Sequence, residues 1–395
     1  MTANVAAHLV KSSLAQRTGT NPLDWFLVFK ARYGMQVVFR ELAEQVNRGA
    51  INGLKPPNRK TVITQAFTCA TAIDPVLVAG LIPDYAEIDL RTLSIDPTQL
   101  ARAETPAATV IQHTFGYISS AAEQLAQTAR ASGALVVEDS AHCVGRMAFD
   151  SRGVPLADVS VHSFGVEKML PTRFGGAIWV SPNMRDRELR ARIAGSLAGL
   201  PSVARRLDVT ARLFRNQNRV LNRLGGAAQP TRAALTALRV YEPAIAKVEQ
   251  EGQLPYPPQA PSPWMTSQMV VGLAELADIE ATRRLASGVY RAELPDELNF
   301  LVDVSQPLLR YPVYAESEMM AEDLIKHLIA NGVYAGRWYR PPLYPGVPDM
   351  HQYNLNLNEL PVTKAASDRI VNLPTNVTGN EARRIAELVR SFVTF

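Results

Sequence analysis

The chain is poor in the residues that mark several large protein classes. Of its 395 residues only two are cysteines, Cys69 and Cys143, and six are histidines. Two cysteines form neither a disulfide framework nor a four-ligand zinc site. No group of His, Cys, Asp and Glu has metal-ligand spacing either, so we expect no metal and a reducing, cytoplasmic location.

Long apolar runs are also missing. The longest candidate, residues 76–82, is far shorter than the ~20 residues that span a bilayer. The N-terminal stretch MTANVAAHLVKSSLAQR has no continuous apolar core followed by a small-residue cleavage site. We therefore expect neither a transmembrane helix nor a secretory signal.

Charge is low overall but unevenly distributed. The 41 basic and 37 acidic residues leave a net charge of +4, too little to indicate a nucleic-acid partner. Residues 185–239, however, contain only three acids, Asp186, Glu188 and Asp208. The same block holds twelve arginines, at positions 185, 187, 190, 192, 205, 206, 212, 215, 219, 223, 232 and 239.

The first half alternates between short apolar runs and amphipathic stretches. A helix over 120–130 separates two strand-like runs, and this rhythm is typical of βαβ units. Strands are predicted at 61–63, 109–112, 134–138, 159–163 and 177–180, and helices at 35–46 and 74–79. The sequence thus indicates an α/β protein with a mostly parallel sheet.

The second half changes character. A Pro-rich stretch at 255–264 reads as a linker or arm, and 267–294 as one long helix or two in series. A strand at 309–313 and helices at 319–331 and 380–392 suggest an α+β unit. We therefore expect a large domain over 1–265, with an Arg-rich helical insertion at about 185–240, and a C-terminal small domain over 266–395.

Three features of the first half suggest a common chemistry. Asp139 ends an apolar strand, where ligands bind in open α/β sheets, and Lys168 follows the next strand, five residues after Ser163. Gly34 is expected to open a helix whose free N–H groups suit a phosphate. A desolvated lysine nucleophile, a carboxylate and a phosphate cradle are what a pyridoxal phosphate (PLP) enzyme needs. Taken singly, each feature has a simpler explanation: Asp139 as a helix cap, Lys168 as a solvated lysine and Gly34 as a turn residue.

Together these motifs make the sequence resemble the DegT/DnrJ/StrS family of PLP-dependent sugar aminotransferases, of the fold type I superfamily. The family's Glu-Asp-x-Ala motif matches residues 138–141, and its Ser-Phe-x-x-x-Lys motif matches 163–168. The resemblance runs from about residue 30 to the C-terminus. It implies a large α/β/α domain, a smaller C-terminal α+β domain and a homodimer with the site at the subunit interface.

The resemblance also implies roles for individual residues. Lys168 would form the Schiff base with PLP, Asp139 would partner the pyridine nitrogen, and Ser163 would bond the phosphate. Gly34 and Met35 occupy a Gly-Thr position whose backbone amides bind that phosphate.

Other family positions carry different residues here. His142 replaces a glutamine near the ring oxygen, and Cys69 replaces an aromatic residue that stacks on the ring. Ser262 stands where relatives donate an asparagine to the neighbouring subunit. Trp338 and Tyr344 replace histidines of the sugar pocket, which indicates a remodelled substrate site.

The expected activity is transfer of an amino group, from glutamate as donor, to a keto sugar linked to a nucleotide. The alternatives are another PLP reaction, such as dehydration or elimination, and a non-catalytic PLP-fold protein that regulates or binds. Lys168 speaks against the sugar dehydratases, which carry histidine there.

The arginine-rich segment 200–224 is predicted to be an amphipathic helix. Leu200, Val203, Leu207, Phe214 and Leu221 share one face, and five arginines share roughly the opposite one. The simpler interpretation is a surface helix packed on the large domain. The alternatives are a peripheral contact with the inner face of a membrane, and binding of the substrate's diphosphate by arginine.

Overall fold

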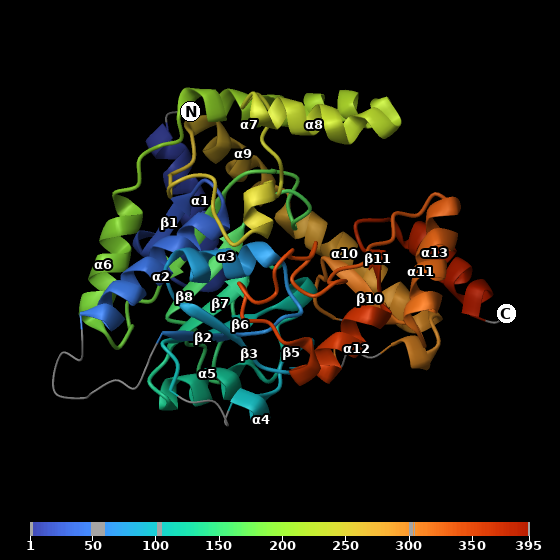
Figure 1. Ribbon diagram of the computed structural model, residues 1–395, viewed down its shortest axis with the longest axis horizontal. Helices are drawn as coiled ribbons and strands as arrows, with labels where there is room; N and C mark the ends of the chain where they lie inside the picture. Colours follow the sequence, from blue (N-terminus) through green and yellow to red (C-terminus); the bar gives the residue numbers. More distant parts are fainter. Residues whose placement is uncertain (1–2, 49–59, 101–104, 300–302, 304, 394–395) are drawn as a thin grey trace.

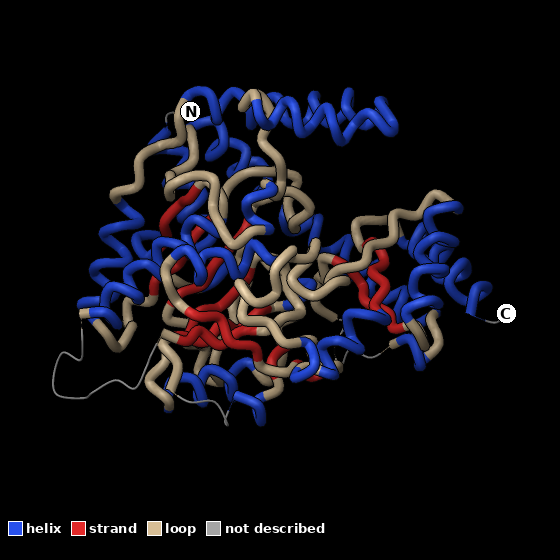
Figure 2. The backbone as a smooth tube through the Cα atoms, in the orientation of Figure 1, coloured by secondary structure: helices blue, strands red, loops and turns tan. Residues whose placement is uncertain are grey.

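The computed structural model describes residues 3–48, 60–100, 105–299, 303 and 305–393. A seven-stranded sheet forms the centre of the larger part, with a separate two-stranded sheet in the C-terminal part (Figures 1 and 2). The order of the large sheet is β1-β9-β8-β7-β6-β2-β3. Its strands are β1 (Trp25–Val28), β2 (Thr61–Thr64), β3 (Ile82–Tyr85), β6 (Ala108–Gln112), β7 (Leu135–Ser140), β8 (Val159–Ser163) and β9 (Gly176–Val180).

The sheet is mostly parallel, as the sequence predicts. Neighbouring strands from β3 through β8 pair in parallel, while β9 is antiparallel to both β8 and β1. Every residue of β6, β7, β8 and β9 is buried, which is why these strands read as continuous apolar runs.

Helices cover both faces of this sheet. On one face Val110 and Val137 pack against α2 (Ala31–Asn47) and α6 (Arg187–Ala198); on the other Ile111 and Val136 pack against α5 (Ala122–Ala131). Next to β1 and β9, α1 (Ala3–Thr18) and α9 (Pro263–Ala274) complete the second layer. The remaining large-domain elements are α3 (Ala70–Val78), α4 (Pro97–Leu100), β4 (Ile88–Asp89) and β5 (Ser94–Ile95). The α/β/α expectation is confirmed.

The C-terminal part packs around an apolar cluster that also includes Phe67, Phe115 and Tyr117 of the large-sheet part. The predicted helix at 267–294 is two helices in series, α9 and α10 (Leu276–Glu293), and the second packs into the C-terminal core through Ala286 and Tyr290. The other elements there are β10 (Arg310–Tyr314), α11 (Glu318–Ala330), α12 (Pro361–Arg369), β11 (Ile370–Pro374) and α13 (Gly379–Val393).

The arginine-rich segment forms α7 (Arg205–Leu221) and α8 (Ala228–Ala237), which run along one edge of the molecule (Figure 1). The apolar face of α7 packs inward: Phe214 is stacked on Tyr241 at 5.8 Å and meets Phe174 edge-on at 5.3 Å. Leu221 is also buried. The packed-helix interpretation is therefore confirmed, and the face that carries Phe214 and Leu221 is buried against the protein.

Candidate active site

Asp139 and Lys168 converge at the carboxyl ends of two adjacent parallel strands. Asp139 is the penultimate residue of β7 and pairs in register with Val161 of β8. The chain leaves β8 at Ser163 and reaches Lys168 five residues later, close enough for the two charges to influence each other. Parallel topology thus places the predicted acid and the predicted nucleophile at one edge of the sheet.

The Asp139 carboxylate is buried but only partly used. Its Oδ1 accepts a hydrogen bond from the Ala141 N–H at 2.9 Å, and no other described residue bonds its side chain. Burial raises the pKa of Asp139, against the opposing effects of that hydrogen bond and of the Lys168 charge. One carboxylate oxygen therefore remains for a ligand.

The Lys168 amine is held without a polar partner. It is half-buried, and among the described residues its nearest recorded contact is the Trp338 ring, whose centroid lies 5.5 Å from Nζ. Burial lowers the pKa of Lys168, partly offset by Cys69 and Asp139. The residue before it, Glu167, has a left-handed backbone with φ 59°. A lysine with a lowered pKa is a better nucleophile, because more of it is neutral at a given pH.

His142 lies within a stack of aromatic rings. Its Nδ1 accepts the Phe115 N–H at 3.0 Å, so in the neutral ring Nε2 carries the proton and donates to the Tyr339 hydroxyl at 3.1 Å. Burial and the charges of Lys168 and Arg310 hold the pKa of His142 well below its usual value. The ring is stacked on Trp338 at 5.6 Å. The one ring donor of His142 is therefore bound to Tyr339 in this structure.

The two predicted substrate residues border the same site. Trp338 and Tyr344 have ring centroids 6.3 Å apart. The Tyr344 carbonyl accepts the Ala70 N–H at 2.9 Å, which ties it to Cys69, the residue that caps the start of α3. The Cys69 Sγ lies 3.1 Å from the Thr71 hydroxyl. The structure thus brings together Cys69, Trp338 and Tyr344, which come from distant parts of the sequence.

The phosphate cradle differs in one detail from the prediction. The helix begins at Ala31, because Lys30 is extended, so Gly34 does not open it. Gly34 and Met35 lie one turn inside α2, where helical geometry directs their N–H groups to preceding carbonyls. Gly34 instead allows close packing, since a Cβ there would lie 2.4 Å from Ile178 side-chain atoms. Met35 is buried in the core on the same face of the sheet.

Ser163 nonetheless lies beside this helix start. Ser163 pairs with Gly176 of β9, and a Cβ on Gly176 would lie 2.7 Å from the Ala31 backbone nitrogen. Only glycine permits that approach. The Ser163 Oγ accepts the Gly165 N–H at 3.2 Å and keeps its own proton to donate. The serine hydroxyl and the free amides of a helix N-terminus are a suitable set for an anion.

Two buried ion pairs flank the same helix start. Lys30 Nζ donates to Glu242 Oε1 at 2.6 Å, and Arg32 Nη1 lies 2.5 Å from Glu249 Oε1. Burial would raise the pKa of Glu249, but Arg32 and Lys30 outweigh it and lower that pKa. The segment after the arginine-rich insertion therefore supplies both acids that pair with the cations at the start of α2.

Ser262 is used within its own chain. It is buried at the start of α9, where its Oγ accepts the Met265 N–H at 3.2 Å and donates to Asp208 of α7. It acts here as a helix cap.

Glu138, the first residue of the motif, is structural. Its carboxylate accepts from the Ala148 N–H at 2.6 Å and the Ser160 hydroxyl at 2.5 Å, and contacts His113 at 2.7 Å. His113 and His162 are both buried core residues with hydrogen-bond partners.

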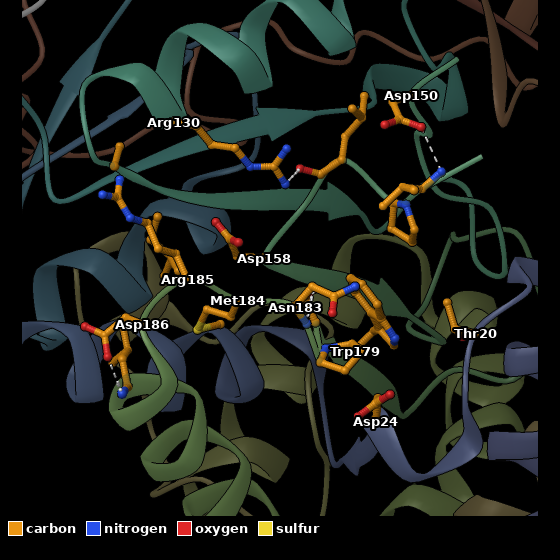
Figure 3. A pocket seen from close by; sticks show the side chains of 18 of the residues that line it. Thr20, Asp24, Arg130, Asp150, Asp158, Trp179, Asn183, Met184, Arg185 and Asp186 are labelled. Atoms are coloured by element: carbon orange, nitrogen blue, oxygen red, sulfur yellow. Dashed lines mark hydrogen bonds between the residues drawn. The ribbon is translucent and has the colours of Figure 1, made fainter. Parts of the chain in front are cut away.

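A large cavity lies away from this site. A groove of about 1760 Å³ opens at the other edge of the sheet, where β7 and β8 begin, and is bordered by Arg130, Asp158 and Trp179 (Figure 3). It is remote from the carboxyl ends of these strands and holds none of the predicted site residues. Within the ranges that the structure describes, no group of His, Cys, Asp and Glu is arranged to hold a metal. In that same part of the chain no helix has the length and apolar character to cross a membrane.

Comparison with known proteins tests the resemblance that the motifs carry. Residues 50–202 match the DegT/DnrJ/EryC1/StrS aminotransferase family. This confirms the predicted resemblance, and the matched segment contains the motifs around Asp139 and Lys168. The DegT match stops before the C-terminal part.

Individual relatives agree with the DegT match. The chain is 32% identical to the spore coat polysaccharide biosynthesis protein SpsC of Bacillus subtilis over 36% of each chain. It is 29% identical to the GDP-perosamine synthase of Caulobacter vibrioides over 30% of this chain and 32% of that one. The alignments thus span about a third of these curated relatives.

Solved structures extend the likeness of fold to the whole chain. PseC of Helicobacter pylori, an aminotransferase involved in the biosynthesis of pseudoaminic acid, aligns with a TM-score of 0.66 and 17% identity. The alignment covers 99% of this chain and 92% of PseC. The fold is therefore that of the fold type I aminotransferases, including the C-terminal part.

Proposed function

We propose that this protein is a PLP-dependent aminotransferase that moves an amino group from an amino acid, glutamate, to a keto sugar carried on a nucleotide. The observation that carries the proposal is the pair of incompletely used groups at the sheet edge. Lys168 has a lowered pKa and no polar partner among the described residues, and Asp139 keeps an oxygen for a ligand. The family match and the amino-sugar relatives support the same activity.

The residues present fit PLP. Lys168 would hold its aldehyde carbon and Asp139 its pyridine nitrogen. Its phosphate would lie against Ser163 and the free amides at the start of α2, one turn before Gly34 and Met35. Cys69 and the His142 ring would border the pyridine ring. When bound, PLP supplies an electron sink for the bond that breaks at the donor's α-carbon.

The chain's own part in the reaction is proton transfer and exclusion of water. Lys168 with its lowered pKa is suited to take a proton and return it, while Asp139 keeps the opposite end of the site negative. Trp338 and Tyr344 form an apolar wall on the substrate side, and we propose that they contact the sugar. Ring walls at these positions exclude water from Lys168.

Two further expectations remain proposals. We propose a cytoplasmic homodimer with the site at the interface, as in the family, and the molar mass in solution tests the dimer. The alternative functions are another PLP reaction and a non-catalytic regulatory role. A screen that follows the mass of the sugar distinguishes these alternatives from transamination. The aminated form of the enzyme, mixed with nucleotide-linked keto sugars, should shift one sugar from ketone to amine; a dehydrated product or no product would overturn the proposal.

We make a separate proposal, that α7 contacts an anionic membrane peripherally. The contact would use the exposed face of the helix, opposite the buried face that carries Phe214 and Leu221. Val209, Leu213 and Val220 are exposed by 45%, 45% and 59% and share an outward stripe beside exposed arginines. Arginines near an anionic surface contribute about 1 kcal/mol each. Co-sedimentation with phosphatidylglycerol vesicles should be salt-sensitive and should be reduced in the double variant Leu213→Ser, Val220→Ser. An absence of binding at low salt would contradict the membrane contact. The exposed arginines would then be solvated or bind the diphosphate of the substrate.

A further inference from the structure

A second, smaller cavity adjoins the candidate active site on the side of the C-terminal domain. It measures about 360 Å³ and is bordered by Glu167 and Lys168 from the large domain. Arg283, Arg310, Tyr334 and Glu381 border it from the C-terminal domain. This size lies at the lower end of small-molecule sites, which suits an amino acid better than a nucleotide-linked sugar.

Arg310 is the distinctive residue of this cavity. Its guanidinium makes no ion pair or hydrogen bond with any residue that the structure describes. It is held instead between rings, with its central carbon 5.4 Å from the Tyr334 centroid and 5.5 Å from the Trp338 centroid. The five N–H donors of an arginine held in this way remain for a ligand.

Two cations therefore share one ring. Lys168 Nζ also lies 5.5 Å from the Trp338 centroid. An anionic group bound to Arg310 would thus be held next to the catalytic lysine, with Trp338 as the common wall.

The other charges at this cavity do not neutralise Arg310. Arg283 donates to the Leu309 carbonyl at 2.9 Å and to the Thr375 hydroxyl at 2.7 Å, so it braces β10 while adding positive charge. Burial and the neighbouring Arg310 lower the pKa of Arg283 to about 10. Glu381 is paired with Arg384, at 2.6 and 2.9 Å. Glu167 is the remaining acid of the cavity wall.

We propose that this cavity binds a carboxylate of the amino donor and that Arg310 is its ligand. The proposal rests on the aminotransferase function and assigns it a donor subsite. A planar guanidinium matches a carboxylate through two parallel hydrogen bonds. A phosphate of the sugar nucleotide has similar chemistry, so the test compares the two sources.

The test uses the full chain loaded with PLP and a dicarboxylate, glutarate, which has no amino group to react. Binding is followed by the intrinsic tryptophan fluorescence, to which Trp338 next to the site contributes, and independently by the thermal shift. Glutarate should bind saturably, and Arg310→Gln should weaken binding at least tenfold, with Arg310→Lys in between. Arg337→Gln is the matched control, because Arg337 precedes Trp338 but is paired with Glu322 at 3.3 Å; it should bind like the wild type.

Three results would overturn the subsite. They are no saturable glutarate binding, equal binding by Arg310→Gln, or tighter, Arg310-dependent binding of inorganic pyrophosphate, which would assign Arg310 to the sugar nucleotide. The visible band of lysine-bound PLP is recorded on the same samples. If that band is present while glutarate fails, the donor subsite alone is wrong; if wild type lacks the band, the proposed function itself is wrong.

Discussion

At the scale of residues, Lys168 carries the main chemical claim. Lys168→Ala should abolish the visible band that forms when PLP is added, because it removes the amine that we propose forms the Schiff base. In the wild type the band should form faster as pH rises through the pKa of Lys168, which burial lowers from its usual range, since the neutral amine attacks. Absorbance spectra and borohydride trapping measure both effects, and a reducible linkage in Lys168→Ala would point to a different lysine.

Asp139 tests the electrostatic half of the site. Asp139→Asn keeps the shape and the acceptor for the Ala141 N–H but removes the negative charge. We expect PLP still to attach to Lys168, while proton abstraction from glutamate slows by orders of magnitude, because the pyridine nitrogen loses its ionic partner. Stopped-flow absorbance gives the rate. A rate equal to that of wild type would make Asp139 a structural cap.

Motifs in the sequence predicted the residues of the site that lie close together along the chain. Asp139, Ser163 and Lys168 follow successive strands, so parallel pairing alone brings them to one edge. Tyr339 was missed, because only the folding of the C-terminal part onto the sheet brings it to His142. Arg310 was missed, because only the fold of the C-terminal part brings it to Trp338. The start of α2 was predicted four residues too late, since a buried glycine gives the same signal for close packing as for an anion site.

At the scale of elements, α7 offers a matched pair of substitutions. Phe214 is 6% exposed within an aromatic cluster, whereas Leu213 beside it is 45% exposed. Phe214→Ala should lower the free energy of unfolding by about 3–5 kcal/mol. Leu213→Ala should change it by about 0.5 kcal/mol or less. Denaturant unfolding compares the two; equal effects would contradict the observed face of α7.

Asp74 in α3 makes stability depend on pH. Burial raises its pKa to about 8, although Tyr353 donates to its Oδ1 at 2.7 Å. The folded state therefore keeps a proton that the unfolded chain releases above about pH 4. This contribution to stability falls between about pH 4 and 8 and is constant above 8.

Asp74→Asn, which cannot titrate, should remove that fall. The difference in unfolding midpoint between Asp74→Asn and wild type should increase as pH rises from 5 to 8 and then stay constant. This increase corresponds to up to several kcal/mol in the free energy of unfolding. Tyr353→Phe removes the hydrogen bond but leaves the carboxyl group, and serves as control. Parallel pH profiles for wild type and Asp74→Asn would show that Asp74 is ionised in the fold.

The sequence predicted the strands at the centre of the large sheet better than those at its edges. Buried central strands such as β6 and β8 were predicted to within a residue, because both faces are apolar. The edge strand β3 was missed, since it contains Pro83 and two exposed residues. The antiparallel placement of β1 was also missed, because its pairing with β9 joins segments about 150 residues apart and leaves no local pattern.

At the scale of the whole molecule, the fold, the arrangement of the site and the relatives all favour one activity. The large sheet positions Lys168 and Asp139, and the C-terminal domain closes the site with Trp338, Tyr339 and Arg310. The insertion packs α7 on the large domain, and the chain that follows it supplies the acids paired with Lys30 and Arg32. Lys168 comes from the part of the chain built on the large sheet, whereas Trp338 and Tyr344 come from the C-terminal part.

The half-reaction tests this account most directly. Purified protein is loaded with PLP, freed of excess cofactor and mixed with glutamate while absorbance is recorded. We predict that the visible band of lysine-bound PLP disappears as pyridoxamine phosphate and 2-oxoglutarate form in equal amounts, and that Lys168→Ala produces neither. A stable visible band in the presence of glutamate, with no 2-oxoglutarate released, would contradict the proposed glutamate-dependent transamination.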